Sequence, residues 1–131
     1  MPDCLIRSEA DLLAVRSLLR EQATIAGMGL VDQTRIITAG SELARNVLKY
    51  AHGSGEMRVV QCSDGRRRGV CAVFRDQGPG IVDLTLAMED GYSTGGSMGK
   101  GLPGAKRLVD EFNIESAPGR GTVITLIKWS R

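Results

Sequence analysis

Aromatic residues and net charge are both scarce in this chain, at 4% of 131 residues and a formal charge of +2. Nucleic-acid binding by stacking relies on aromatic platforms and a strong positive field, so no nucleic-acid partner is expected. The apolar runs are also far shorter than the roughly 20 residues that span a bilayer. No membrane segment is expected either.

Cysteine is rare as well, and its placement excludes a disulfide framework. Cys4, Cys62 and Cys71 are odd in number and lack metal-ligand spacing, so we expect buried, reduced thiols. Residues 1–7 do not have the layout of a secretory signal peptide. We therefore expect a cytoplasmic protein, and its 131 residues fit one domain over positions 1–131.

Hydrophobic periodicity and turn residues predict an α+β fold. Ser8 is expected to cap the first helix, with Asp11 returning toward it, and Asp32 is expected to cap a second helix. The run Arg66, Arg67 and Arg68 follows a turn and is expected at a solvated hairpin tip. Helices are predicted at about 8–26, 33–51, 83–88 and 102–111, and strands at about 4–7, 57–62, 70–74, 112–115 and 122–129.

Four short motifs occur in one order along the chain, at residues 41–46 (SELARN), 76–80 (DQGPG), 99–104 (GKGLPG) and 121–125 (GTVIT). In the first, Glu42 and Asn46 are four residues apart, so on a helix they share one face. A carboxylate and an amide placed in this way can hold a water, a hydroxyl or a metal ion. The glycine-rich turns allow the backbone to approach a ligand closely.

The third motif opens a predicted helix, and such a loop offers unpaired N–H groups to phosphate oxygens. It has neither the terminal Lys-Ser/Thr of a P-loop nor a dinucleotide fingerprint. Residues 91–101 have almost no apolar content, so we expect them to form a mobile lid over a nucleotide.

Taken together, the four motifs resemble the boxes of the GHKL superfamily, which includes DNA gyrase, the Hsp90 chaperones, sensor histidine kinases and MutL. The resemblance covers essentially the whole chain. It implies a two-layer α/β sandwich, with a mixed, mainly antiparallel sheet packed on helices on one face. It also implies ATP and Mg²⁺ as cofactors.

The resemblance assigns roles to individual residues. Asn46 would ligate Mg²⁺, and Glu42 would be the general base toward a water or a substrate hydroxyl. Asp76 would accept a hydrogen bond from the adenine amine, supported by Thr125, with Thr122 as the second candidate. Lys100 either contacts the terminal phosphate or faces solvent. Other nucleotide contacts implied are Gly78, Gly80, Gly99, Gly101, Leu102 and Gly104.

Within the superfamily, residues 41–46, 89–94 and 101–108 resemble the switch kinases of the bacterial stressosome. That resemblance implies a serine/threonine protein kinase that phosphorylates STAS-domain scaffold and antagonist proteins and activates a PP2C-type phosphatase. Two alternatives stay open, an anti-sigma-factor kinase and a nucleotide-dependent binding module with little catalysis. Arg45 is expected to form a structural ion pair or a partner contact, and His52 is not expected to accept phosphate.

Overall fold

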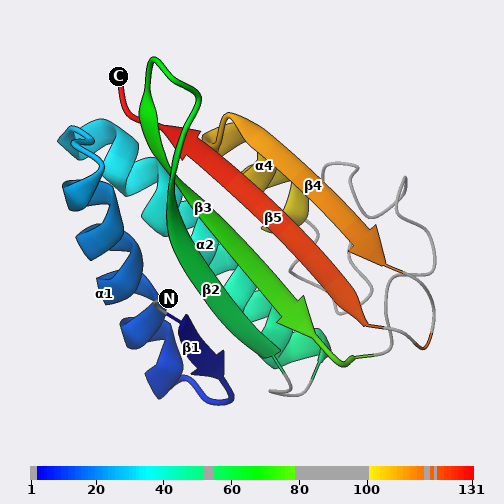
Figure 1. Ribbon diagram of the computed structural model, residues 1–131. Coiled ribbons are helices and arrows are strands. Elements are labelled where there is room, and N and C mark those ends of the chain that lie inside the picture. The colour runs from blue at the N-terminus through cyan, green and yellow to red at the C-terminus, as the bar shows by residue number, and fades with distance from the viewer. Residues whose placement is uncertain (1–2, 52–54, 79–100, 117–118, 120) are drawn as a thin grey trace.

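A computed structural model describes residues 3–51, 55–78, 101–116, 119 and 121–131. A five-stranded sheet in the order β1-β2-β3-β5-β4 is covered on one face by helices (Figure 1). The helix layer on one face confirms the predicted α+β sandwich, and every described strand pairing is antiparallel, whereas a mixed, mainly antiparallel sheet was predicted. The strands are β1 Asp3–Ile6, β2 Gly55–Ser63, β3 Arg68–Asp76, β4 Glu111–Ser116 and β5 Thr122–Trp129, and the helices are α1 Ala10–Ile25, α2 Leu30–Tyr50 and α4 Gly101–Leu108.

The start of α1 follows the expected pattern only in part. The N-cap is Glu9 rather than the predicted Ser8, and its side chain makes no capping hydrogen bond, whereas Asp11 does turn back toward Ser8. Asp11 Oδ2 accepts hydrogen bonds from the backbone N–H groups of Arg7 and Ser8, at 2.7 and 3.0 Å. The bond from Arg7 is the main reason why the pKa of Asp11 lies below its ordinary value. The chain is thereby turned from β1 into the helix.

The start of α2 differs from the prediction. The helix begins at Leu30 with Gly29 at the N-cap, so Asp32 lies inside the first turn and does not cap it. Its carboxylate instead lies 3.3 Å from Nζ of Lys128, a side chain that is 2% exposed. A buried ammonium requires a counter-charge, and this requirement could not be read from the local sequence around Asp32.

The core lies between the helices and the sheet. Ile36, Ala39 and Leu43 of α2 are almost fully buried, as are Phe74 and Leu126 of the sheet. Burial of one such large apolar side chain stabilises the fold by about 1.5–3 kcal/mol. Gly40 lets α1 and α2 approach each other, because a Cβ there would lie 2.3 Å from Leu19 Cδ1.

Successive side chains along each strand point alternately to the helix-covered face and to the uncovered face of the sheet. Met57, Phe74 and Leu126 point to the helices, whereas Cys62 and Cys71 lie on the uncovered face and are half-buried. The expectation of buried thiols is therefore too strong. Partial burial still raises the pKa of both thiols, which favours the protonated form and makes them weak nucleophiles.

Other predicted boundaries hold to within a few residues. The strand β5 spans the predicted 122–129, while α4 ends at Leu108 because Glu111 already pairs in β4. The predicted short helix at 83–88 and nearly all of the expected lid at 91–101 lie outside the described residues. In the part of the chain that is described, no helix is long and apolar enough to cross a membrane.

Candidate functional site

Glu42 and Asn46 lie on α2, on the flank that faces away from α1. The opposite flank is occupied, because Gly40 packs against Leu19 of α1 and Ser41 Oγ accepts a hydrogen bond from Arg16 Nε at 3.0 Å. Glu42 and Asn46 project at least about 100° around the helix axis from these two positions. As predicted, they lie on the same helix, one turn apart.

The amide oxygen of Asn46 has no hydrogen-bond partner among the described residues, although it is buried. An unsatisfied buried acceptor costs about 1–3 kcal/mol, so such groups are rare in folded proteins and call for an explanation. A hard oxygen in this state suits a cation or a ligand donor. The described residues contain no group of three or more His, Cys, Asp or Glu side chains that could hold a metal.

Glu42 is paired with a residue of its own helix. Arg45 Nη1 donates a hydrogen bond to Glu42 Oε1 at 2.9 Å, and the Glu42 side chain is 30% exposed. Such a half-exposed pair on one helix contributes only about 0.3–0.5 kcal/mol to stability. Its main effect is to hold the carboxylate in one orientation while leaving it open to a substrate, and it confirms Arg45 as an ion-pair residue.

Asp76 ends β3 and projects on the helix-covered face of the sheet. Its Oδ1 accepts a hydrogen bond from the Gly78 backbone N–H at 2.9 Å. Burial raises the pKa of Asp76, while hydrogen bonds from the backbone N–H groups of Gly78 and Thr122 act in the opposite direction. The carboxylate is thus held in place at the end of the sheet and partly removed from water.

Gly78 connects this carboxylate to α2. A Cβ at Gly78 would lie 2.8 Å from Cβ of Ala51, the C-cap of α2. Ala51 follows Asn46 by five residues, a distance of about 7.5 Å along the helix axis. The turn after Asp76 is therefore packed on the same end of α2 that carries Asn46.

The two threonines of the last motif lie on opposite faces of β5. Thr122 pairs with Asp76 across the strands and is 7% exposed, and its hydroxyl lies 2.8 Å from Ser116 Oγ. Thr125 pairs with Val73 on the uncovered face. The expectation that ranked Thr125 above Thr122 is therefore wrong, because an odd spacing along a strand reverses the direction of the side chain.

Gly121 also belongs to this end of the sheet, and its role was not anticipated from the sequence. It has φ +77°, and a Cβ there would lie 2.1 Å from the Asp76 carbonyl oxygen. Only glycine combines that conformation with so close an approach. Its position in the motif 121–125 is the one signal that the sequence offers.

The third motif is described only in part. Leu102 is 8% exposed and belongs to the core, whereas a Cβ at Gly104 would meet nothing within 4 Å. Gly101 begins α4. Gly80, Gly99 and Lys100 lie outside the described residues, so their predicted roles toward phosphate stay predictions.

Comparisons with known proteins agree with this arrangement. Residues 31–130 match a family model described as "Histidine kinase-, DNA gyrase B-, and HSP90-like ATPase". Among solved structures, the mycobacterial sensor histidine kinase MprB has a TM-score of 0.60 at 17% identity, covering 99% of this chain and 97% of that one. The chain belongs to this family, the GHKL ATPases, and ATP use follows from that membership.

The sequence is also similar to individual members of the family. It is 51% identical over 126 residues to the serine/threonine-protein kinase RsbT of Bacillus subtilis (strain 168), covering 96% of this chain and 94% of RsbT. It is 31% identical over 104 residues to an anti-sigma F factor of Pasteuria penetrans, covering 76% and 69%. Within the GHKL family, the chain is a serine/threonine protein kinase.

Proposed function

We propose that this kinase uses Mg·ATP to phosphorylate STAS-domain scaffold and antagonist proteins in bacterial stress signalling, and that it acts as a partner switch that activates a PP2C-type phosphatase. The observation that carries its catalytic part is the unpaired, buried amide oxygen of Asn46, one helical turn from Glu42. The similarity to RsbT supports a kinase rather than a pure binding module.

In this proposal, Asn46 would hold Mg²⁺, because an amide oxygen is a hard ligand that suits this ion. When bound, the ion would neutralise charge on the phosphates. Glu42 accepts the proton of a substrate Ser or Thr hydroxyl. Arg45 positions Glu42 through the 2.9 Å hydrogen bond.

Asp76 has the role of recognising adenine. A carboxylate accepts the hydrogen bond of the exocyclic amine and disfavours guanine, which presents a carbonyl in that position. The N–H groups of Gly78 and Thr122 hold the carboxylate, and Gly121 lets β5 pass close to the Asp76 backbone. Burial of Asp76 strengthens its selectivity, since an unpaired donor or acceptor is costly where water is excluded.

A second candidate function is that of an anti-sigma-factor kinase. It is favoured by the 31% identity to an anti-sigma F factor. Both functions use the same nucleotide site, so only the identity of the protein partners separates them.

The test combines a transfer assay with partner capture. The purified chain is incubated with γ-labelled ATP, Mg²⁺ and either STAS-domain proteins or sigma factors of the same organism. We expect label on a Ser or Thr of a STAS-domain protein, lost in Glu42→Gln and kept in the exposed control variant Glu115→Gln. Stable capture of a sigma factor would favour the second candidate, and absence of any transfer would overturn both.

A further inference from the structure

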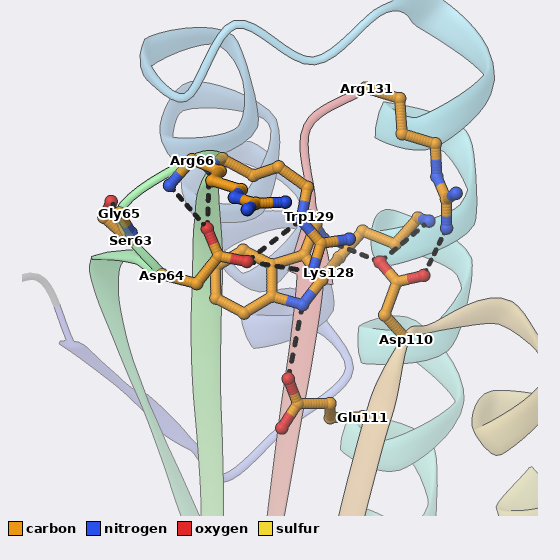
Figure 2. A network of polar contacts seen from close by, with 10 residues as sticks. Ser63, Asp64, Gly65, Arg66, Asp110, Glu111, Lys128, Trp129 and Arg131 are labelled. Carbon is orange, nitrogen blue, oxygen red and sulfur yellow. Dashed lines mark hydrogen bonds and ion pairs between the residues drawn. The ribbon is translucent and has the colours of Figure 1, made fainter.

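At the end of the sheet remote from Asp76, the turn between β2 and β3 is held by its own carboxylate. Asp64 Oδ1 accepts hydrogen bonds from the backbone N–H groups of Arg66 and Arg67, at 2.9 and 2.7 Å, and its Oδ2 pairs with the Arg67 side chain (Figure 2). These bonds lower the pKa of Asp64 to about 2, and the hydrogen bond from the Arg67 backbone contributes most. The turn is therefore fixed at neutral pH.

Two arginines of this turn are also held by side-chain contacts. The Arg67 guanidinium lies 4.9 Å from the ring centre of Trp129, whose Nε1 donates to Glu111 Oε2 at 3.2 Å. Arg68 Nη2 donates to the Ile25 carbonyl oxygen at 2.6 Å. An arginine that is already positioned loses less conformational entropy when it binds a further partner.

These arginines line an open hollow of about 480 Å³. Among the described residues, no Asp or Glu side chain lines the hollow. Asp64 and Asp110 lie beside it, where they pair with Arg67 and Arg131, so the hollow gathers four guanidinium groups of which two already have a carboxylate partner. We call it the arginine hollow, and it is lined by Ala26, Arg66, Arg67, Arg68, Ser130 and Arg131.

Exposed apolar side chains lie at the two helix ends on either side of Ala26, which lines the arginine hollow. Ile25 ends α1, and Leu30 and Val31 begin α2, with exposed fractions of 49%, 80% and 64%. The turn between the two helices reaches the C-terminal segment, since a Cβ at Gly27 would lie 3.7 Å from Ser130 Oγ. One exposed leucine is ordinary, but three exposed apolar residues beside a cationic hollow are typical of a protein interface.

We infer that the arginine hollow and its apolar border form a docking surface for an acidic segment of a partner protein. Carboxylates of the segment would pair with Arg66, Arg68 and Arg131, since guanidinium groups bind carboxylates in bidentate fashion. Apolar residues of the segment would pack on Leu30 and Val31. Charge complementarity selects this occupant over a basic one, and the covered face of Trp129 leaves no free stacking platform for a nucleic acid.

This surface is separate from the nucleotide site. The strand β3 runs from Arg68 at the hollow to Asp76 at the other end, eight steps of about 3.3 Å each. A partner held here therefore leaves the ATP site open. The inference stands independently of the proposed substrates.

The test measures fluorescence anisotropy of the full chain with a labelled peptide built from Glu, Leu and Ser. Matched peptides replace Leu by Ser, or Glu by Lys. The variant Arg66→Glu/Arg131→Gln removes charge from the hollow, and Leu30→Ser alters its border. The control double variant Arg7→Glu/Arg58→Gln makes the same change in net charge away from the hollow, and ATP affinity reports that each variant is folded.

We expect saturable binding of the acidic, Leu-containing peptide, weakened at least about tenfold by Arg66→Glu/Arg131→Gln and also weakened by Leu30→Ser. The control double variant should bind like the unaltered chain. The inference is overturned if no saturable binding occurs, if the control variant loses as much affinity, or if a DNA oligonucleotide binds more tightly than the peptide. If the peptide with Ser in place of Leu bound equally well, the apolar border would have no role in docking.

Discussion

Arg45 holds Glu42 by a 2.9 Å hydrogen bond from the next turn of the same helix. Among the described residues, the orientation of the candidate base is therefore favoured from within α2, before any substrate or nucleotide arrives. A side chain biased in this way loses somewhat less entropy on reaching its reactive geometry. The arrangement places the base on a rigid element rather than on a loop.

Replacement of Glu42 by Gln should separate chemistry from binding. Glutamine keeps an oxygen for Arg45 but cannot accept a proton, so phosphotransfer should fall by about a hundredfold or more. ATP affinity should change little. Single-turnover transfer and equilibrium ATP binding measure the two effects, and transfer retained in this variant would remove Glu42 from the base role.

Replacement of Asn46 by Ala tests the unpaired oxygen through stability alone. Because its Oδ1 has no partner in the described structure, its removal should leave the free energy of unfolding without nucleotide unchanged to within about 1 kcal/mol, or raise it. Gln22→Ala is the matched control, since Gln22 is buried and Oε1 accepts a hydrogen bond from Gln61 at 2.8 Å. Urea unfolding should show a loss for the control only.

Replacement of Asp76 by Asn should weaken ATP binding without weakening the fold. Burial raises the pKa of Asp76 in the folded chain, so the ionised form costs stability as pH rises from the unfolded pKa of about 3.9 through the raised value. Asparagine removes this cost and keeps an oxygen for Gly78. We expect equal stability of the two proteins below about pH 4, and a variant at least as stable at pH 7.

The same variant loses the charged acceptor for the adenine amine, so its affinity for ATP should fall by about tenfold or more. Calorimetric titration with ATP and GTP measures this loss and the expected decline in selectivity. Unchanged affinity and selectivity would take Asp76 out of adenine recognition.

Gly121 and Gly119 form a matched pair for testing the approach to Asp76. Both have positive φ, at +77° and +78°, but only a Cβ at Gly121 meets an obstacle, the Asp76 carbonyl oxygen at 2.1 Å. Gly119→Ala should cost about 1–2 kcal/mol through backbone strain alone. Gly121→Ala should cost more and should also lower ATP affinity, as thermal unfolding and ATP titration will report.

Lys128 provides a prediction for the stability of the fold. Nζ of this buried side chain lies 3.3 Å from Asp32 and 3.2 Å from Asp110. Lys128→Met leaves both carboxylates without their central cation, which should cost about 3–5 kcal/mol near neutral pH. Arg131→Met is the control, because Arg131 is 57% exposed and should contribute less than about 1 kcal/mol.

The pH dependence of that loss follows from Asp110. Burial alone would raise its pKa, but the Trp129 N–H, Lys128 and Arg131 together lower it. A carboxyl with a lowered pKa contributes stability above its unfolded pKa, and this contribution disappears as pH falls below about 4. The difference between the unaltered chain and Lys128→Met should therefore shrink in acid.

Periodicity predicted the elements that carry the site. The apolar spacing along α2 and the alternation along β5 are strong, because each element has one buried face. Glu42 and Asn46 were therefore assigned correctly to a helix. Such patterns follow from local geometry and need no knowledge of the rest of the chain.

Tertiary pairing could not be predicted in this way. Lysine usually lies at the protein surface, so the sequence gives no sign that Lys128 is buried. Only the fold brings Asp32 and Asp110 to it. The roles of Thr122 and Thr125 depend on which residue of β5 lies opposite Asp76. That register is set by the whole sheet. The sequence of a motif that contains both threonines therefore could not tell which of them lies beside Asp76.

Whether the buried Asn46 oxygen binds Mg²⁺ can be measured as the dependence of ATP affinity on Mg²⁺ concentration, in the unaltered chain and in Asn46→Ala. If this oxygen is a ligand of the ion, Mg²⁺ should tighten ATP binding to the unaltered chain, and Asn46→Ala should lose most of that gain while still binding ATP without the ion. An equal gain from Mg²⁺ in both proteins would show that Asn46 does not hold the ion.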